Sequence, residues 1–193
     1  MNSGNGASPV LISGLREIAD RFDHVLLDQY GVLHEGRAVF PEARDCVLAL
    51  RAAGKRVLVL SNSGKRAAEN LARIAGHGLA ADAYDGAITS GEVTWHGLRQ
   101  RAEPPFADLG TRCFAITRGR DRSIVDGLSL TIVGDMGDAD FILLGGLDDA
   151  GSDRRQWEDE FRAAAARRLP MLCANPDIKM FGAQGLIPGP GAL

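Results

Sequence analysis

The sequence predicts an α/β protein whose core is a parallel sheet. Short apolar runs alternate with segments of helical spacing along most of the 193 residues, which is typical of parallel α/β sheets. Two of the apolar runs end in polar residues: Asp28 follows 25–27, and Ser61 and Asn62 follow 57–60. Because the carboxyl ends of parallel strands meet at one edge of a sheet, we expect these polar side chains to share a site.

The first half of the chain contains three predicted helices and three predicted strands. Pro41 fits the first turn of a helix, and Gly54 fits its end. The apolar runs are short and rich in valine and leucine, as in buried strands. In chain order, we expect a helix at 11–22, a strand at 24–27, a helix at 41–53, a strand at 56–60, a helix at 66–77 and a strand at 87–89.

The second half of the chain repeats this alternation and predicts a second α/β module. The segment 157–168 is rich in alanine and arginine, which are good helix formers. The Gly/Pro-rich stretch 182–191 is of low complexity. In chain order, we expect a helix at 92–101, strands at 113–117 and 131–133 with a short helix between them, a strand at 141–144, a helix at 157–168 and a last strand at 171–173.

The composition excludes several classes of protein. The net charge of −3 provides no basic surface for nucleic acid. No segment approaches the roughly twenty apolar residues of a membrane span, so we expect no membrane partner and a cytoplasmic location. Residues 1–9 lack the charged and apolar regions of a signal peptide. Cys46, Cys113 and Cys173 lie far apart beside apolar residues, which predicts reduced core cysteines rather than a disulfide or a metal site.

Four short motifs follow one another in a recognisable order. They are Asp-Gln-Tyr-Gly-Val-Leu at 28–33, Ser-Asn at 61–62, Thr-Ser-Gly-Glu at 89–92 and Cys-Ala-Asn-Pro-Asp at 173–177. In this order the motifs resemble those of the haloacid dehalogenase (HAD) superfamily, subclass IIA, which includes NagD-like and p-nitrophenyl phosphatase-like hydrolases. The resemblance extends from about residue 11 to the end of the sequence.

The resemblance implies a domain organisation. It implies the N-terminal part of a Rossmann-like HAD core at 11–89, an inserted α/β cap at 90–174 and a return to the core at 175–193. Before the core, the Gly/Ser/Asn-rich composition predicts a disordered tail at 1–10. The family places a lysine and a Gly-Asp-x-x-x-x-Asp metal motif after the Asn-Pro-Asp segment, and the sequence ends before either, so we expect a core truncated at its C-terminal end. The segment 133–140 superficially copies that metal motif, but it precedes Asn175, and we interpret it as a loop of the cap. A homodimer formed through the cap is compatible with the resemblance.

For Asp28 the resemblance implies nucleophilic catalysis on a small phosphorylated metabolite. Its carboxylate would attack phosphorus in line and form an aspartyl-phosphate, which water then hydrolyses. Ser61 would donate a hydrogen bond to a phosphoryl oxygen, and Mg²⁺ would bind the Asp28 carboxylate and the backbone carbonyl of Tyr30. The other substrate-binding or hinge residues that the resemblance implies are Gly31, Asn62, Ser63, Asn175 and Asp177.

Each of these positions also has an ordinary structural interpretation. Asp28 could end its strand as a turn residue, and Ser61 could cap the following helix. Asn175 could close an Asx turn before the proline-rich loop. Basic residues near the motifs could face an anion, although exposed lysines and arginines are usually solvated. The further polar residues that could face the site are His34, Lys65, Arg66 and Lys179.

Tyr30 departs from the phosphatase pattern of this superfamily. Phosphatases usually carry a second aspartate two residues after the nucleophile, where it protonates the leaving oxygen and later activates water. Tyrosine is a poor general base at neutral pH, because its phenol ionises at about pH 10. Two alternatives therefore stay open: a non-catalytic ligand-binding or regulatory protein on the HAD scaffold, and a metal-independent 2-haloacid dehalogenase. The dehalogenase is less favoured, because the 33 positions between Asp28 and Ser61 leave little room for the helical cap of those enzymes.

Overall fold

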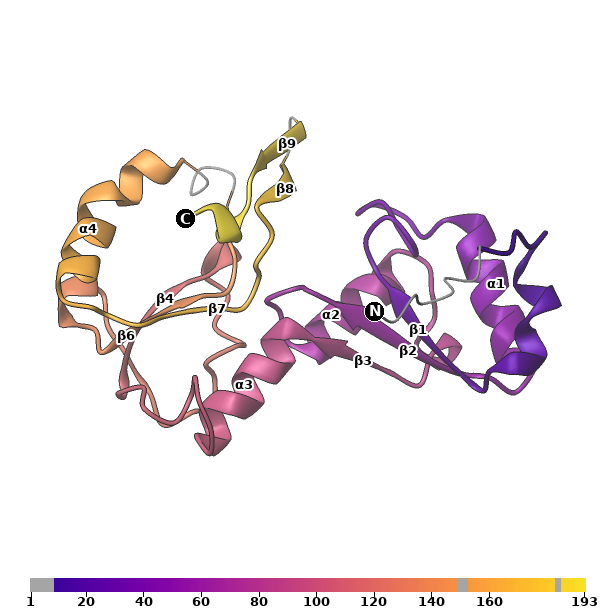
Figure 1. The fold of residues 1–193 in the computed structure, drawn as a ribbon, viewed down its shortest axis with the longest axis horizontal. Helices are drawn as coiled ribbons and strands as arrows, with labels where there is room; N and C mark the ends of the chain where they lie inside the picture. Colours follow the sequence, from indigo (N-terminus) through magenta and orange to yellow (C-terminus); the bar gives the residue numbers. More distant parts are fainter. Residues whose placement is uncertain (1–8, 149–152, 183–184) are drawn as a thin grey trace, which may run out of the picture.

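The protein forms two parallel sheets that lie at opposite ends of an elongated molecule (Figure 1). The structure is a computed structural model, and it describes residues 9–148, 153–182 and 185–193. Most of the tail expected at 1–10 lies outside these described residues. The predicted α/β class with parallel sheets is confirmed.

The first sheet has the strand order β1-β2-β3, and both of its pairings are parallel. In the register Asp28 lies beside Leu60, and Ser61 lies beside Thr89. The three strands therefore bring the first residues of the first three motifs to one edge. The elements are β1 (His24–Asp28), α1 (Pro41–Ala52), β2 (Arg56–Ser61), α2 (Ala67–Gly76) and β3 (Gly86–Thr89).

Both helices of this half pack on the same face of the first sheet. Val57 and Val59 of β2 are almost fully buried against Val47 of α1 and Ile74 of α2. Alternate residues point to the other face, where Leu26 is 61% exposed and Leu60 and Ile88, paired between β2 and β3, are nearly half exposed. The core of this half therefore lies on one side of its sheet.

The second sheet has the order β5-β4-β6-β7, and all of its pairings are parallel. Helices cover its two faces: Leu98 of α3 packs with Phe141 and Leu143, and Ala164 of α4 packs with the alternate residues of β6. All four residues of β6 are buried, as a central parallel strand requires. The elements are α3 (Ser90–Gln100), β4 (Arg112–Ile116), β5 (Thr131–Ile132), β6 (Phe141–Leu144), α4 (Glu158–Ala166) and β7 (Met171–Cys173).

A β-hairpin that the sequence did not predict follows the second sheet. Its strands, β8 (Lys179–Gly182) and β9 (Gly185–Pro188), pair only with each other among the described residues and are antiparallel. The hairpin extends from the second-sheet half beside the space between the two sheets (Figure 1). Glycine and proline at the strand ends hide the alternation by which a strand is normally recognised in a sequence.

Two other expectations are corrected by the structure. Residues 11–22 form the short 3₁₀ turns Leu15–Glu17 and Ala19–Arg21 rather than an α-helix, because Leu11 and Leu15 find no apolar surface and stay exposed. The short helix expected between β4 and β5 is only a 3₁₀ turn, Arg118–Arg120, with Gly119 at a positive φ. None of the helices in the described ranges combines the length and the apolar composition that a membrane crossing requires.

Candidate functional site

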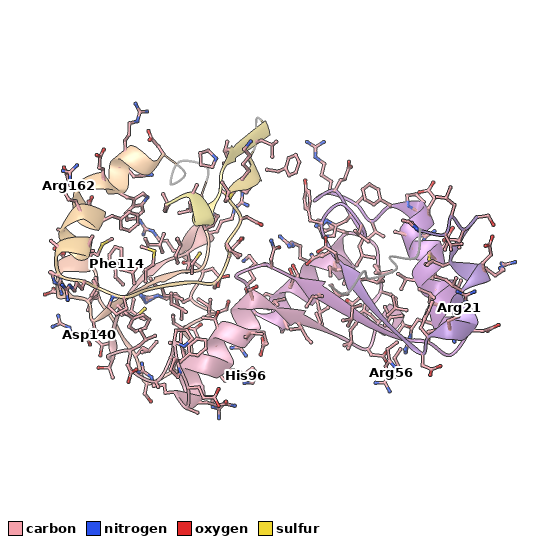
Figure 2. All side chains as sticks on the ribbon, viewed as in Figure 1. Arg21, Arg56, His96, Phe114, Asp140 and Arg162 are labelled. Carbon is pink, nitrogen blue, oxygen red and sulfur yellow. The ribbon has the colours of Figure 1, made fainter. Side chains whose placement is uncertain are left out.

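A cavity of about 800 Å³ lies at the carboxyl edge of the first sheet and extends to the second sheet and the hairpin. Arg56 marks the first-sheet half and Asp140 the second-sheet half on opposite sides of the intervening space (Figure 2). Three loops supply most of the lining: the loop after β1, the loop after β2 and the segment between β7 and β8. The lining residues from these loops include Asp28, Tyr30, Ser61, Asn62, Ser63, Asn175 and Asp177.

Seven of the eight residues that the resemblance implied are thus brought together at one cavity. Gly31 is the exception, because it is absent from the described lining and its N–H is donated to the carbonyl of His34. The φ of Gly31 is +81°, so its role in the structure is to turn the chain after Tyr30. Among the basic residues singled out in the sequence, Lys65 and Lys179 line the cavity.

The loop after β2 holds Ser61 in place through its own hydroxyl groups. Ser61 is only 8% exposed, and its Oγ accepts a hydrogen bond from the N–H of Ser63 at 3.2 Å. The Oγ of Ser63 accepts one in turn from the N–H of Lys65 at 3.3 Å. Accepting a bond does not use the hydroxyl hydrogen of Ser61, so this side chain keeps a donor for an anion.

The start of helix α2 does not line the cavity, and Ser61 does not cap this helix. The helix begins at Ala67, and the N–H of Ala67 is donated to Glu92 at 3.0 Å. Glu92 also receives two hydrogen bonds from Arg66, at 2.8 and 2.9 Å. The hydrogen bonds from Arg66 are the main reason that the pKa of Glu92 falls to about 2, despite the opposing effect of burial. Arg66 therefore belongs to the junction of α2 and α3 and not to the cavity.

Glycines allow the two halves of the molecule to approach each other beside the cavity. A Cβ atom at Gly64, after β2, would overlap the carbonyl oxygen of Gly145, after β6. A Cβ atom at Gly91, in the first turn of α3, would overlap the carbonyl of Gly64. The glycine of the Thr-Ser-Gly-Glu motif is thus explained by a close backbone contact.

The part of the chain that follows β7 touches both loops of the first sheet, through the segment before β8 and through β8 itself. Asn62 donates a hydrogen bond from Nδ2 to Oδ1 of Asp177 at 2.6 Å. Asn175 accepts the N–H of Asp177 at 3.0 Å, which is the Asx turn that was the alternative interpretation of this residue. Tyr30 stacks on Phe181 with ring centroids 5.2 Å apart and an angle of 26° between the planes.

A buried chain of hydrogen bonds lies beneath the loop after β1. Arg73 of α2 donates to Oδ1 of Asn70 at 3.0 Å, and Nδ2 of Asn70 donates to Oε1 of Gln29. The side-chain amide of Gln29 in turn lies 2.8 Å from Nε2 of His34. Gln29, Asn70 and His34 are each no more than 1% exposed. The network therefore ties α2 to the residue next to Asp28.

His34 belongs to this network and does not line the cavity, contrary to the possibility raised by its place in the sequence. Burial, followed by repulsion from His77 and Arg73, lowers the pKa of His34 to about 4. Its ring is therefore neutral at pH 7. Nδ1 of the ring accepts the N–H of Gly36 at 2.9 Å, and Nε2 contacts the side-chain amide of Gln29. The ring also meets Tyr30 edge-on, with centroids 5.9 Å apart.

Two arginines that were not singled out in the sequence also line the cavity. Arg73 lies on α2, and Arg118 follows β4, so they come from opposite halves of the molecule. Loss of hydration and repulsion from Arg118 lower the pKa of Arg73. The sequence alone does not distinguish Arg73 from a solvated arginine on the surface of a helix. Arg118 follows a strand and belongs to no recognised motif.

The cysteines show one difference from expectation. Cys113 is fully buried, and burial raises the pKa of its thiol to about 12. Cys46 is partly buried, whereas Cys173 is exposed, although it was expected in the core. All three are free thiols, as expected.

The oxygen donors at the end of β1 fit part of a magnesium site. Magnesium commonly takes one or two carboxylates together with water and substrate phosphate oxygens. The Asp28 carboxylate and the Tyr30 carbonyl are donors of this type. Within 9–148, 153–182 and 185–193, no three His, Cys, Asp or Glu side chains cluster as a complete metal site would. The described residues therefore supply a partial set of ligands.

Comparison with known proteins gives a consistent result. The family model described as haloacid dehalogenase-like hydrolase matches residues 25–131. Mouse chronophin is 31% identical over 127 residues, which cover 65% of this chain and 43% of chronophin. The resemblance to NagD-like and p-nitrophenyl phosphatase-like hydrolases is confirmed.

Solved structures show the same fold. A haloacid dehalogenase-like hydrolase from Brucella suis 1330 superposes with a TM-score of 0.83 at 30% identity, over 95% of this chain and 65% of that one. Glycerol phosphate phosphatase from Mycobacterium tuberculosis, solved in complex with calcium, gives a TM-score of 0.64 at 26% identity, over 91% of this chain and 49% of that one. The chain thus spans less than half the length of chronophin and about half that of the mycobacterial phosphatase.

Proposed function

Because the chain belongs to the haloacid dehalogenase-like hydrolase family, we propose that it carries the nucleophile of a phosphatase-type hydrolase for small phosphorylated metabolites. One observation carries the proposal: Asp28 and Ser61 end adjacent parallel strands at the same cavity. The volume of that cavity, about 800 Å³, suits a small ligand. Two similar proteins, 4-nitrophenylphosphatase and glycerol phosphate phosphatase, carry names that agree with this chemistry. The name of a third, chronophin, states no reaction.

The proposed reaction has two steps. First, a carboxylate oxygen of Asp28 forms a bond to phosphorus while the bond from phosphorus to the leaving oxygen breaks. Water then attacks the aspartyl-phosphate, which releases inorganic phosphate and restores the Asp28 carboxylate. Throughout, the Ser61 hydroxyl donates to a phosphoryl oxygen, and the Ser63 N–H keeps Ser61 in position.

A carboxylate nucleophile and a phosphate repel each other, so the site needs positive charge. The Asp28 carboxylate and the Tyr30 carbonyl would hold Mg²⁺, which would offset the negative charge of the carboxylate and the phosphate. Lys65 and Lys179 line the cavity and add to its positive potential. Lys65 is also paired with Asp121 at 2.9 Å, so part of its charge is already offset.

We also propose that residues 90–174 form a cap over the first-sheet core. Two hydrophobic clusters belonging to the second sheet, separate from the cluster of the first sheet, support this division. Gly145 and Arg118 bring this part of the chain to the cavity. Substrate choice would then depend on residues of the cap as well as on the core.

A second candidate function is ligand binding without turnover. The observation that favours it is Tyr30, which occupies the place of the usual acid/base aspartate and whose ring is stacked on Phe181. A phenol in that place offers a weak acid and no effective base at neutral pH. The same assay separates the two candidates.

The test is hydrolysis of p-nitrophenyl phosphate by the protein with and without Mg²⁺. We expect Mg²⁺-dependent release of p-nitrophenolate, and loss of at least about 10³-fold in kcat for Asp28→Asn, because the nucleophile is gone. Asp45→Asn, on an exposed face of α1, is the matched control and should retain activity. Full activity in Asp28→Asn would contradict the mechanism, and tight binding of a phosphate ester without turnover would support the second candidate.

A further inference from the structure

Part of the lining of the cavity at Asp28 is apolar and aromatic, in contrast to the polar loop that carries Ser61. The ring of Tyr30 belongs to this part and is stacked on the ring of Phe181 from the hairpin. Further apolar lining residues from the second half of the chain are Leu147, Met180 and Pro190. Ligand cavities commonly combine apolar walls of this kind with a few polar groups that fix the orientation of the ligand.

The two stacked rings remain accessible at the cavity. Tyr30 is 46% exposed and Phe181 is 57% exposed, although each ring covers part of the other. Tyr30 also meets the buried ring of His34 at 84°, so its ring is supported from within the first half of the molecule. A single exposed apolar residue is ordinary on a protein surface. Two stacked rings that line a cavity, however, provide a flat surface on which an apolar group can pack.

The proposed reaction directs the leaving group toward this part of the cavity. In-line attack puts the leaving oxygen on the side of phosphorus opposite the Asp28 carboxylate. The leaving group therefore points away from the end of β1. The cavity continues in that direction to the second sheet and to the hairpin, which extends beside the space between the two halves (Figure 1).

We propose that Phe181, stacked on Tyr30, is a specificity-determining residue that packs against an apolar ring in the leaving group of the substrate. This inference rests on the proposed function and narrows its substrate class to phosphate monoesters of apolar ring compounds, as opposed to esters of short polyols. A ring suits the site because it can lie on an aromatic face, and the contact removes apolar surface of both partners from water.

The hairpin makes the contribution of Phe181 separable from that of the reacting groups. Within the described part of the chain, β8 and β9 pair with each other and with no strand of either parallel sheet. The side chain of Phe181 can therefore be replaced while the strand ends that carry Asp28 and Ser61 stay in place. Across the hairpin, Phe181 is paired with Leu186, which is 60% exposed and does not belong to the described lining of the cavity. Leu186 thus provides a matched control.

Phenyl phosphate and glycerol 1-phosphate test the assignment. Both are phosphate monoesters of a small compound, but the first has an apolar ring and the second has a polar chain. Binding is measured by calorimetry in the Asp28→Asn background with Mg²⁺, so that neither ester is consumed. We expect phenyl phosphate to bind about 10-fold more tightly than glycerol 1-phosphate, which is near the upper end of what one aromatic contact provides.

Phe181→Ala should remove most of this preference and leave the binding of glycerol 1-phosphate unchanged, whereas Leu186→Ala should keep the preference. Equal binding of the two esters, or a preference that survives Phe181→Ala, would overturn the inference and leave the proposed function intact. Equal weakening of both esters in Phe181→Ala would also overturn it, because that result indicates a structural role. If neither ester binds and the unmutated protein hydrolyses no p-nitrophenyl phosphate, the proposed function fails and the inference fails with it.

Discussion

Asn62 and Asp177 are 115 positions apart in the sequence and are joined by a 2.6 Å hydrogen bond across the cavity. Asn62 belongs to the loop that carries Ser61, and Asp177 belongs to the segment that leads from the second sheet to the hairpin. The contact therefore fastens one half of the molecule to the other at the site itself. Its partners are a neutral donor and a carboxylate, which makes the bond stronger than one between neutral groups.

We expect the Asn62–Asp177 bond to contribute measurably to stability. A double-mutant cycle with Asn62→Ala and Asp177→Ala, measured by urea unfolding, should give a coupling free energy of about 1 kcal/mol. The value is at the low end for a charged acceptor, because both groups are accessible to water. Asp159→Ala on α4, combined with Asn62→Ala, is the control and should show no coupling. Additive effects for Asn62 and Asp177 would mean that the bond contributes nothing.

The contact between Gly64 and Gly145 predicts that a methyl group is not tolerated there. Gly64→Ala should lower the free energy of unfolding by about 1–3 kcal/mol, because the backbones must separate to make room. Gly76→Ala in α2 is the matched control, since a Cβ atom at that position meets nothing within 4 Å. That control should stabilise the protein by roughly 0.5–1 kcal/mol, as alanine does in a helix. A Gly64→Ala protein as stable as the unmutated one would show that the two halves do not meet at this point.

The buried His34 predicts a stability change in mild acid. Its pKa is about 4 in the folded protein and about 6.5 when the chain is unfolded, so between these values the unfolded chain binds more protons. The stabilisation is therefore complete above about pH 6.5 and is lost as the pH falls through about 4.

Chemical denaturation between pH 4 and pH 7 measures this change. His34→Gln should be less stable at pH 7 by about 1–3 kcal/mol, because the buried amide of Gln29 and the N–H of Gly36 lose their hydrogen-bond partner. The pH dependence of its stability should also be flatter than that of the unmutated protein. His24→Gln, at an exposed position of β1, should leave the profile unchanged. An unchanged profile in His34→Gln would contradict the assignment.

Tyr30 predicts a dependence on the leaving group. The p-nitrophenolate anion leaves without a proton, whereas an alkoxide needs one from a general acid. Replacing Tyr30 by aspartate supplies that acid, and Tyr30→Asp should raise the rate of propyl phosphate hydrolysis by about 10²-fold or more. The rate with p-nitrophenyl phosphate should change much less. Tyr30→Phe keeps the stacking on Phe181 and serves as the control for the ring itself. Equal changes for both esters in Tyr30→Asp would exclude a general acid at this position.

Most of the regular elements could be predicted from the sequence, because their signals are local. The strands that end at Asp28 and Ser61 were recognised from apolar runs followed by polar residues, and α1 was recognised from Pro41 and Gly54. The predicted helix at 11–22 was wrong, since helical spacing does not ensure that a surface exists for the apolar residues to cover. The hairpin of β8 and β9 was missed, because its glycines and prolines mask the alternation of its side chains.

By itself the sequence determined which chain segments end in Asp28 and Ser61 and that parallel strands carry them, because strand patterning and polar strand ends are properties of neighbouring residues. Only the tertiary structure decided that Asp177 meets Asn62, that His34 turns inward to Gln29, and that Arg73 and Arg118 face one cavity. The first and the last of these relationships join residues from opposite halves of the molecule, and they depend on how the halves pack around glycines such as Gly64. The contact of His34 lies within one loop, but Gln29 is itself held by Asn70 of α2. No pattern within a single segment encodes such packing.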